Sequence, residues 1–298
     1  MTLKQLEAFY WTATLGNFAS AAARLHLTPS TLSKRISELE AELDTRLFSR
    51  SSQRALPTAS GERLIEHARH MLEIQSRIRA DVTPSRLFQG TCRFGISELV
   101  ALTWFPSFVR RVQSLFPDLV LEPHVDLTAH CERKLERGEL DFAVIPGPAE
   151  STHLRSELIC QLDYTWTSSP ERLAPDTQLM PQHFIEHPVI LLEPQSRLTR
   201  LVNDWLTENR IEIRRSLTCN SLSALIELTI SGVGISFFPK QYIDPLLSKG
   251  YLGRLEYGGD LPNLRYYFES RRDDTRALLR TMRDMVFEEA TFQPRVRT

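Results

Sequence analysis

Short hydroxyl side chains around one lysine form a surface that can contact nucleic acid. They lie on the polar face of a helix predicted over residues 28–43, and they are Ser30, Thr31, Ser33 and Lys34. A predicted hairpin over residues 46–58 adds the arginines Arg46, Arg50 and Arg54. Hydroxyls and cations bind phosphate oxygens and base edges. For an isolated helix, the alternative is an ordinary solvated face. The neighbouring elements must therefore distinguish a nucleic-acid-binding face from a solvated one.

A second set of polar side chains follows the strands of a predicted α/β region. The set comprises Ser97, Glu98, Thr128, Ser196, Arg197 and Asn220, with Leu99 as an apolar neighbour. Strand ends and helix N-termini meet in such sheets, where free N–H groups and helix dipoles favour anions. Helix capping explains any one of these residues, but their equivalent places together favour a binding cleft.

The helix dipoles and Arg197 favour a small organic acid as the ligand of this cleft. Arg197 can pair with a carboxylate. Glu98 lies at a positive helix end, where it either complements the dipole or repels an acidic ligand. We therefore expect an organic anion, and a neutral or cationic ligand is the alternative.

Common catalytic and cofactor motifs are missing from the sequence. GxSxG, HExxH, GxxxxGK[ST] and GxGxxG do not occur. Cys92, Cys131, Cys160 and Cys219 are too widely spaced for a zinc site, and they are expected to be free thiols. His130 and His124 are expected at the surface. We expect no enzyme, no cofactor and no metal; an enzyme or a solute-binding protein that uses the cleft is the rival class.

Two predicted helices precede the polar helix and position it. The spacing of apolar residues predicts a helix from Leu3 that ends at Gly16, and alanines make residues 18–25 a short helix that others can approach closely. Thr28 caps the polar helix and Pro29 begins it. With the arginine-bearing hairpin this order predicts a winged helix-turn-helix whose second helix enters the major groove.

The charge distribution agrees with a nucleic-acid-binding N-terminal module. Residues 1–88 carry 12 Lys and Arg against 9 Asp and Glu, a net charge of +3, whereas residues 89–298 carry 24 against 28, a net charge of −4. Composition, with 42% hydrophobic and 24% charged residues, is that of a globular protein. The chain lacks a long apolar run and a signal-like start, so we expect a cytoplasmic protein without membrane contact.

A long helix is predicted over residues 58–82. Its seam recurs every four and three residues and consists of Leu64, Ala68, Met71, Gln75, Ile78 and Val82. Such a seam favours dimerisation through this helix over packing against its own chain. Two recognition helices would then face two half-sites on one side of DNA, which predicts an inverted-repeat operator.

The remainder is predicted to form two similar α/β lobes. Lobe I has strands over residues 92–96, 119–125 and 141–145 and helices over 100–115 and 128–137; lobe II has strands over 188–192, 215–219 and 234–238 and helices over 198–208 and 221–231. We place a DNA-binding domain at residues 1–58, a linker helix and hinge at 59–89 and a ligand-binding domain at 90–298. Lobe I takes about 90–161 and 266–298, and lobe II takes 162–265.

The N-terminal residues resemble the winged helix of LysR-type transcriptional regulators. The resemblance covers roughly the first 60 residues without gaps, in the segments Leu6-Glu7-Ala8-Phe9, Gly16-Asn17-Phe18-Ala19-Ser20-Ala21-Ala22, Leu25-His26-Leu27-Thr28, Leu32-Ser33-Lys34-Arg35-Ile36 and Leu47-Phe48-Ser49-Arg50. Looser matches such as Leu135-Glu136-Arg137-Gly138-Glu139-Leu140-Asp141 resemble the effector domain of that family, which is similar to periplasmic binding proteins.

The resemblance implies that Ser33, Lys34 and their neighbours approach DNA, with Arg50 and Arg54 in the wing. Pro29 and Ser30 stand where the family often has glutamine and proline, so a base-reading amide is missing, and Ser20 stands where an arginine is common. We therefore expect Lys34 to be the leading base contact and the other polar residues to position the helix.

The resemblance also implies a transcriptional activator that works with partners. They are double-stranded DNA, a small-molecule inducer contacting Ser97, Thr128, Ser196 and Asn220, RNA polymerase, and further copies of the chain in a dimer or a tetramer. The inducer, the target genes, the default action and the choice between dimer and tetramer stay open at this point.

Overall fold

The first three helices form a module with its own apolar core. The structure is a computed structural model that describes residues 1–49, 55–82, 88 and 90–294. Helix α1 (Leu3–Leu15) begins with a capping box at Thr2 and ends at Gly16, whose φ of 61° suits glycine. Asn17 caps α2 (Phe18–Arg24) and Thr28 caps α3 (Pro29–Glu42). The predicted order of the helix-turn-helix and the start of its polar helix are confirmed.

The two arms of the predicted hairpin pair next to this module. Ser49 N–H donates to Leu56 O over 2.9 Å, and Thr58 N–H donates to Leu47 O over the same distance. Glu40 of α3 holds the first arm, because its Oε1 accepts the backbone N–H groups of Leu47 and Phe48. The arginines predicted for the wing, Arg50 and Arg54, lie outside the described residues.

Helix α4 (Ala59–Val82) divides its apolar seam between two environments. Ala68 is buried and Leu64 packs against the core of the helix-turn-helix module, so this part of the seam faces its own chain. Met71, Ile74 and Ile78 are exposed farther along. The side chain of Val82, the last member of the predicted seam, is not among those that the structure describes. Packing against the chain itself, the alternative reading of the seam, thus holds for its first half.

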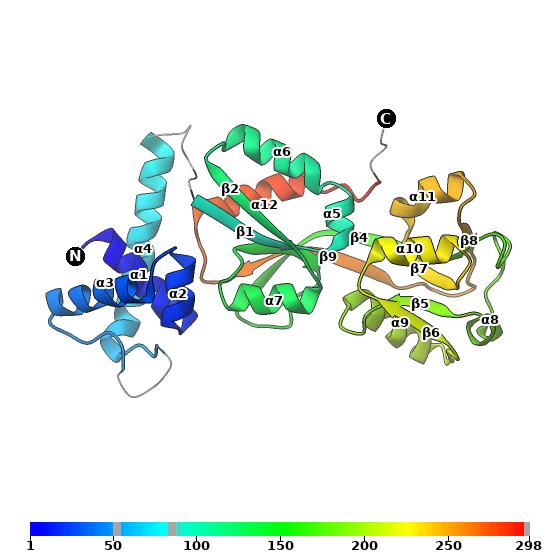
Figure 1. Ribbon diagram of the computed structural model, residues 1–298, viewed down its shortest axis with the longest axis horizontal. Helices are drawn as coiled ribbons and strands as arrows, with labels where there is room; N and C mark the ends of the chain where they lie inside the picture. The colour runs from blue at the N-terminus through cyan, green and yellow to red at the C-terminus, as the bar shows by residue number, and fades with distance from the viewer. Residues whose placement is uncertain (50–54, 83–87, 89, 295–298) are drawn as a thin grey trace.

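Lobe I is a sheet covered by helices on both faces (Figure 1). Strands β1 (Gly90–Ile96), β2 (Leu119–Val125) and β3 (Phe142–Pro146) run parallel, with β1 in the middle. Helices α6 (Phe105–Leu115) and α12 (Ala277–Glu289) lie on one face and α7 (Thr128–Glu136) on the other. The helix predicted over 100–115 is wrong in extent, because α5 (Glu98–Leu102) ends at Thr103 and α6 starts anew with proline in its first turn.

Lobe II repeats the arrangement with shorter strands. Strands β5 (Val189–Leu192), β6 (Ser216–Cys219) and β7 (Ile235–Pro239) are parallel, and β5 lies between the others. The helices of this lobe are α8 (Pro181–Glu186), α9 (Arg197–Glu208), α10 (Leu222–Ile230) and α11 (Lys240–Ser248). The parallel order brings the carboxyl ends of β5 and β6 together at one sheet edge.

Two long strands connect the lobes. Strand β4 (Leu154–Ser168) runs antiparallel to β9 (Asn263–Arg271) in lobe I, and it then pairs with β7 and β8 (Gly253–Leu255) in lobe II. The strand order is β2-β1-β3-β9-β4-β7-β5-β6. We did not predict β4 or β9 from the sequence. They form the floor between the lobes, so a ligand there would contact both.

The helix-turn-helix module is joined to lobe I by buried charges, a contact that we call the junction. Its members are Trp11 of α1, Arg24 of α2, and Asp141, Arg271, Asp274 and Arg276 of lobe I. The Asp141 carboxylate forms ion pairs with Arg24 and Arg276 and accepts the Arg93 backbone N–H over 2.7 Å. The Asp141 and Arg24 side chains are 0% and 7% exposed.

Aromatic and tight contacts complete the junction. Guanidinium carbons of Arg24, Arg271 and Arg276 lie 4.7, 5.1 and 5.4 Å from the centre of the Trp11 ring. A Cβ at Gly138 would stand 2.2 Å from the Leu15 side chain, so a glycine permits this close approach. Burial by itself would raise the pKa of Asp141, but Arg276 and Arg24 hold it well below its usual range.

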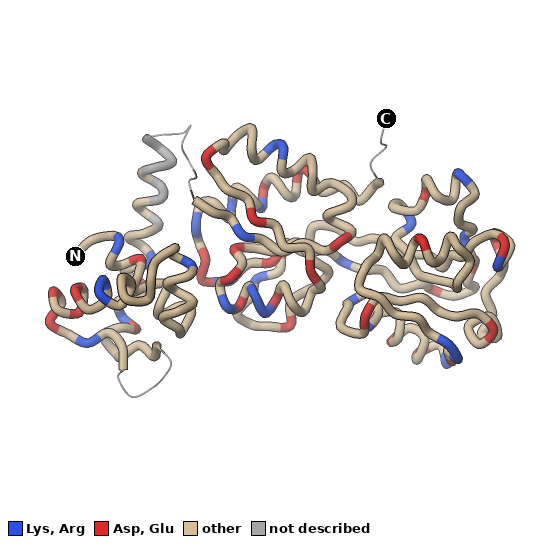
Figure 2. The backbone as a smooth tube through the Cα atoms, viewed as in Figure 1, with Lys and Arg blue, Asp and Glu red and all other residues tan. Residues whose placement is uncertain are grey.

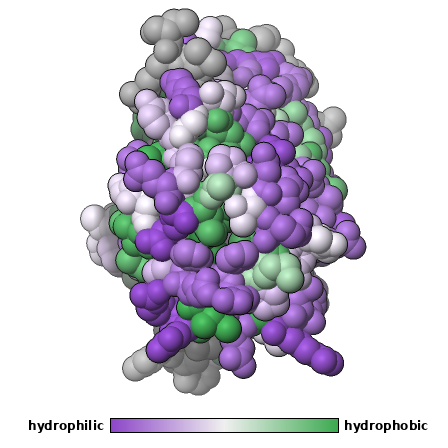
Figure 3. Space-filling model, turned by 90° about the vertical axis from the view of Figure 1, so that its right-hand side faces the viewer, coloured by the Kyte–Doolittle hydropathy of each residue, from purple (hydrophilic) through white to green (hydrophobic). Residues whose placement is uncertain are grey.

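The outer surface of lobe II is mainly hydrophilic. Figure 3 looks onto this end of the molecule, where small apolar patches are separated by polar side chains. Among the described residues, no helix combines the length and apolar character needed to cross a membrane. The four cysteines are free thiols, and within the described ranges no group of three or more His, Cys, Asp or Glu residues is placed to hold a metal ion.

Candidate functional sites

The polar face of α3 is exposed as the sequence predicts. Ser30, Thr31, Ser33 and Lys34 all face solvent, while Leu32 and Ile36 are buried on the opposite side. Basic residues occupy the first half of the helix and acidic residues the second half (Figure 2). An approaching phosphate backbone would therefore favour the N-terminal half of α3.

The four polar side chains differ in their local bonding. The Thr28 hydroxyl accepts the Thr31 N–H and lies 3.0 and 2.8 Å from the hydroxyls of Ser30 and Thr31. These two hydroxyls thus belong to the helix cap. Ser33 and Lys34 follow on the exposed face, with no side-chain bond to the part of the chain that the structure describes. They are the side chains most available to a base edge.

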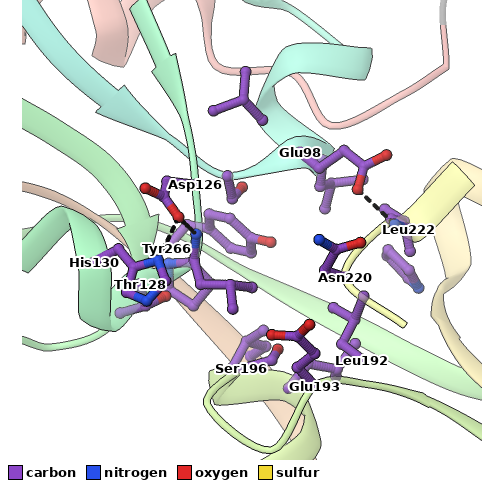
Figure 4. A pocket seen from close by; sticks show the side chains of 18 of the residues that line it. Glu98, Asp126, Thr128, His130, Leu192, Glu193, Ser196, Asn220, Leu222 and Tyr266 are labelled. Carbon is purple, nitrogen blue, oxygen red and sulfur yellow. Dashed lines mark hydrogen bonds and ion pairs between the residues drawn. The ribbon is translucent and has the colours of Figure 1, made fainter. Parts of the chain in front are cut away.

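A cavity of about 210 Å³ lies between the two lobes of the ligand-binding region, and we call it the cleft. Its lining residues come from both lobes and from the connecting strands: Ser97, Glu98, Leu99, Val125, Asp126, Leu127, Thr128, His130, Pro146, Tyr164, Leu192, Glu193, Ser196, Leu198, Asn220, Leu222, Pro239, Leu264 and Tyr266. Six of the seven side chains proposed from sequence, all except Arg197, therefore lie around one cavity (Figure 4).

Arg197 does not line the cleft, contrary to its predicted place. Its guanidinium donates to Glu132 Oε1 over 3.1 Å and to Pro148 O over 2.7 Å, both in lobe I. It lines a smaller hollow together with Glu132, Glu150 and Arg200. Arg197 thus connects the lobes beside the cleft, and the organic-acid prediction loses the cation on which it depended.

Helix capping accounts for only one of the four hydroxyl and amide side chains. The Ser97 hydroxyl accepts the Val100 N–H and caps α5. Ser221, and not Asn220, caps α10. Ser196 precedes α9 without a side-chain capping bond, and Thr128 is already inside α7. Ser196, Thr128 and Asn220 therefore keep polar atoms that capping does not use.

Glu98 closes one side of the cleft by bonding across it. Its carboxylate accepts the backbone N–H groups of Leu222 and Ser223 at the amino end of α10, and the hydroxyls of Ser221 and Ser223 over 3.0 and 2.9 Å. The α10 terminus would otherwise attract an anion. The Glu98 carboxylate of lobe I therefore occupies the anion-binding position at the amino end of α10 in lobe II.

The sequence reasoning missed several residues of the cleft. Asp126 bonds His130 Nδ1 over 2.7 Å, Lys134 Nζ over 3.0 Å and Leu127 N over 2.9 Å. Burial would raise the pKa of Asp126, but the bonds from His130 and Lys134 keep it below its usual value. The i, i+4 spacing of Asp126 and His130 after a strand was a usable signal. His130, expected only at the surface, is part of this group.

The floor and the lobe II wall add Tyr164, Tyr266 and Glu193. The two tyrosines come from β4 and β9, which we did not predict, and burial raises the pKa of Tyr266 to about 12. Glu193 follows β5 as Asn220 follows β6, and Leu192 and Cys219 are register partners. The sequence indicates that Glu193 and Asn220 are equivalent if β5 and β6 are assumed to be neighbouring strands.

A buried acid lies behind the connection between the lobes. Glu269 of β9 is buried, its Oε1 accepts the Ser156 hydroxyl over 3.4 Å, and its Oε2 has no partner within the described residues. Burial and the neighbouring Glu132 raise the pKa of Glu269 to about 8. Glu269 therefore keeps its proton at neutral pH.

Comparisons with known proteins agree with both parts of the molecule. Residues 85–291 match the LysR substrate binding domain, and residues 3–62 match the bacterial regulatory helix-turn-helix proteins of the lysR family. The HTH-type transcriptional regulator YofA of Bacillus subtilis is 28% identical over 243 residues, which cover 80% of this chain and 81% of that protein.

Solved structures share the fold over nearly the full length. ArgP from Mycobacterium tuberculosis aligns with a TM-score of 0.65 and 21% identity, covering 98% of each chain. Full-length CbnR in complex with its target DNA aligns with a TM-score of 0.53 and 19% identity, covering 98% of this chain and 100% of that one. With its helix-turn-helix and its two-lobed domain both matched, the chain belongs to the LysR family of transcriptional regulators and carries the effector-binding domain of that family.

Proposed function

We propose that this regulator binds an inverted-repeat operator in double-stranded DNA through the head of α3, with Lys34 as the leading base contact. The exposure of Ser33 and Lys34 next to a cap that engages Ser30 and Thr31 carries this proposal. Arg50 and Arg54 would contact the backbone beside it. The DNA-binding domain spans residues 1–58, the linker helix and hinge span 59–89, and the ligand-binding domain spans 90–298. The regulator acts in the cytoplasm, where its DNA is.

Dimers would form through the exposed apolar half of α4, around Met71, Ile74 and Ile78, and would pair again into tetramers. A small-molecule inducer in the cleft would contact Ser97, Glu98, Leu99, Thr128, Ser196 and Asn220. Because a ligand shifts only an equilibrium between states that it binds unequally, it must favour one relative position of the lobes. The changed assembly would then activate transcription by recruiting RNA polymerase. The organic acid that the sequence favours is one of the ligand classes to be tested.

Fluorescence anisotropy with the DNA upstream of the coding sequence, against scrambled DNA and over a series of salt concentrations, tests the function. We expect sequence preference and a steep salt dependence. Lys34→Ala should cost about 1–3 kcal/mol of binding free energy on the preferred site and relax its specificity. Lys4→Ala removes an exposed lysine from α1 of the same module and is the matched control. Equal losses in the two variants would contradict the role of Lys34.

A further inference from the structure

The cleft contains more carboxylates than cations. Its lining includes Glu98, Asp126 and Glu193, and among the described residues no lysine or arginine lines it. Asp126 is compensated by His130 and Lys134. Glu98 is compensated only by backbone and hydroxyl donors, and Glu193 has no ion pair or side-chain hydrogen bond within the described ranges. The site therefore presents uncompensated negative charge to a ligand.

Three of the positive groups that an anion could use are already occupied. The α10 amino end is bonded to Glu98, and the Leu127 N–H at the start of α7 is bonded to Asp126. Arg197 is bonded to Glu132 and Pro148 outside the cleft. An anionic ligand that used these groups would have to displace their bonds. At the amino end of α9, which Ser196 does not cap with its side chain, it would approach Glu193, and this disfavours acids on electrostatic grounds.

Polar acceptors gather on the lobe II side. Glu193 and Ser196 lie in the loop between β5 and α9, and Asn220 follows the neighbouring strand β6, so two loops bring them to one wall (Figure 4). Ser196 is only 5% exposed and Thr128, facing it from lobe I, is 6% exposed. Neither hydroxyl has a side-chain bond to a described residue. A carboxylate, an amide oxygen and a hydroxyl match the three N–H donors of an ammonium group.

The other walls suit a compact apolar body. Leucines at 99, 192, 198 and 264 and the rings of Tyr164 and Tyr266 line the cavity. Aromatic faces also attract cations. The volume of about 210 Å³ lies below the range of roughly 300–1,000 Å³ that is common for ligand pockets, which favours a small molecule.

We propose that the cleft binds a compact organic amine in its ammonium form, with Glu193 as the counter-ion and Ser196 and Asn220 as further acceptors. This proposal rests on the function proposed above, in which the cleft is the inducer site. It concerns the class of ligand, which the family match leaves open.

Thermal unfolding of the full chain with probes of matched shape tests the ligand class. The probes are benzylamine, benzyl alcohol and benzoate, and a smaller set of isobutylamine, isobutanol and isobutyrate. We expect an increase in Tm with at least one amine that its alcohol and its acid do not produce. Stabilisation by an acid without its amine, or no stabilisation by either amine, would overturn the proposal.

Glu193→Gln tests the assigned counter-ion. Because a hydrogen bond to a charged group is lost, the Kd of a stabilising amine, measured by calorimetry, should rise roughly 10-fold to 100-fold. Glu212→Gln, which neutralises an exposed carboxylate between α9 and β6, is the control and should leave the Kd unchanged. An unchanged Kd in Glu193→Gln, with the Tm of the free protein preserved, would overturn the assignment.

The DNA anisotropy assay separates the two proposals. Amine binding that leaves the DNA complex unaltered would contradict the inducer role of the cleft, while the ligand class would stand. A DNA response to acids alone would support the inducer role and overturn the ligand class.

Discussion

The junction and the cleft both contain carboxylates, but they satisfy them differently. At the junction, Asp141 is paired with Arg24 and Arg276, so every charge has a partner inside the protein. In and behind the cleft, Glu193 has no described partner and Glu269 keeps one oxygen without a bond. Charges that are paired internally hold domains together, whereas unpaired ones are available to a ligand or to a proton.

Removal of the junction carboxylate should give the largest effect. Asp141→Ala leaves Arg24 buried without its counter-charge, while Arg276 still pairs with Asp274, and it should cost about 3–5 kcal/mol of the free energy of unfolding in urea titrations. Asp118→Ala, an exposed aspartate before β2, is the control. A loss no larger than that of the control would show that the junction is not held by this charge.

The same pair of variants has a pH signature. The folded pKa of Asp141 lies below its value in the unfolded chain, so its contribution is complete above about pH 4 and disappears as the pH falls through the folded pKa. The difference between wild type and Asp141→Ala should therefore shrink in acid. A constant difference across that range would contradict the ion pairing.

Glu269→Gln should have the next largest effect, with the opposite sign. The folded pKa of Glu269 is about 8, above the unfolded value near 4.5, so the folded protein keeps a proton that the unfolded chain has lost. Wild-type stability should fall as the pH rises between these values. Glu269→Gln removes that fall and should be more stable at pH 8 by on the order of 2–4 kcal/mol. Glu136→Gln, on the exposed face of α7, should keep the wild-type slope.

Glu98→Ala should give the smallest loss of stability and a new binding property. Its bonds to the α10 terminus contribute about 1–2 kcal/mol. Without this carboxylate the N–H groups of Leu222 and Ser223 become free, so benzoate should begin to raise the Tm. Glu98→Gln retains an acceptor and should respond less. If benzoate has no effect on Glu98→Ala, the amino end of α10 is not the anion site that Glu98 occupies.

The helix-turn-helix could be predicted because its signals are local. Thr28 and Pro29 define the start of α3 through their own backbone chemistry, and the spacing of Leu32, Ile36 and Leu39 defines its buried face. Strand ends likewise indicated Ser97, Thr128, Ser196 and Asn220, because parallel strands deliver such residues to one edge.

The connecting strands and the charge pairing could not be predicted in this way. Strands β4 and β9 pair residues about a hundred positions apart, and neither carries a local signal that names its partner. The sequence therefore did not indicate that Tyr164 and Tyr266 line the cleft. The sequence predicts Asp141 to be the first residue of a strand, but β3 begins at Phe142 and Asp141 is the buried centre of the junction.

The amino-acid sequence by itself determined the family, the helix-turn-helix and six of the side chains that line the cleft, since caps, periodicities and strand ends act over a few residues. Only the tertiary structure decided which charges meet. It paired Arg197 with Glu132, Arg24 with Asp141 and Glu98 with the α10 terminus. Electrostatic partners depend on distance in space and on burial, and a sequence specifies neither until the chain has folded.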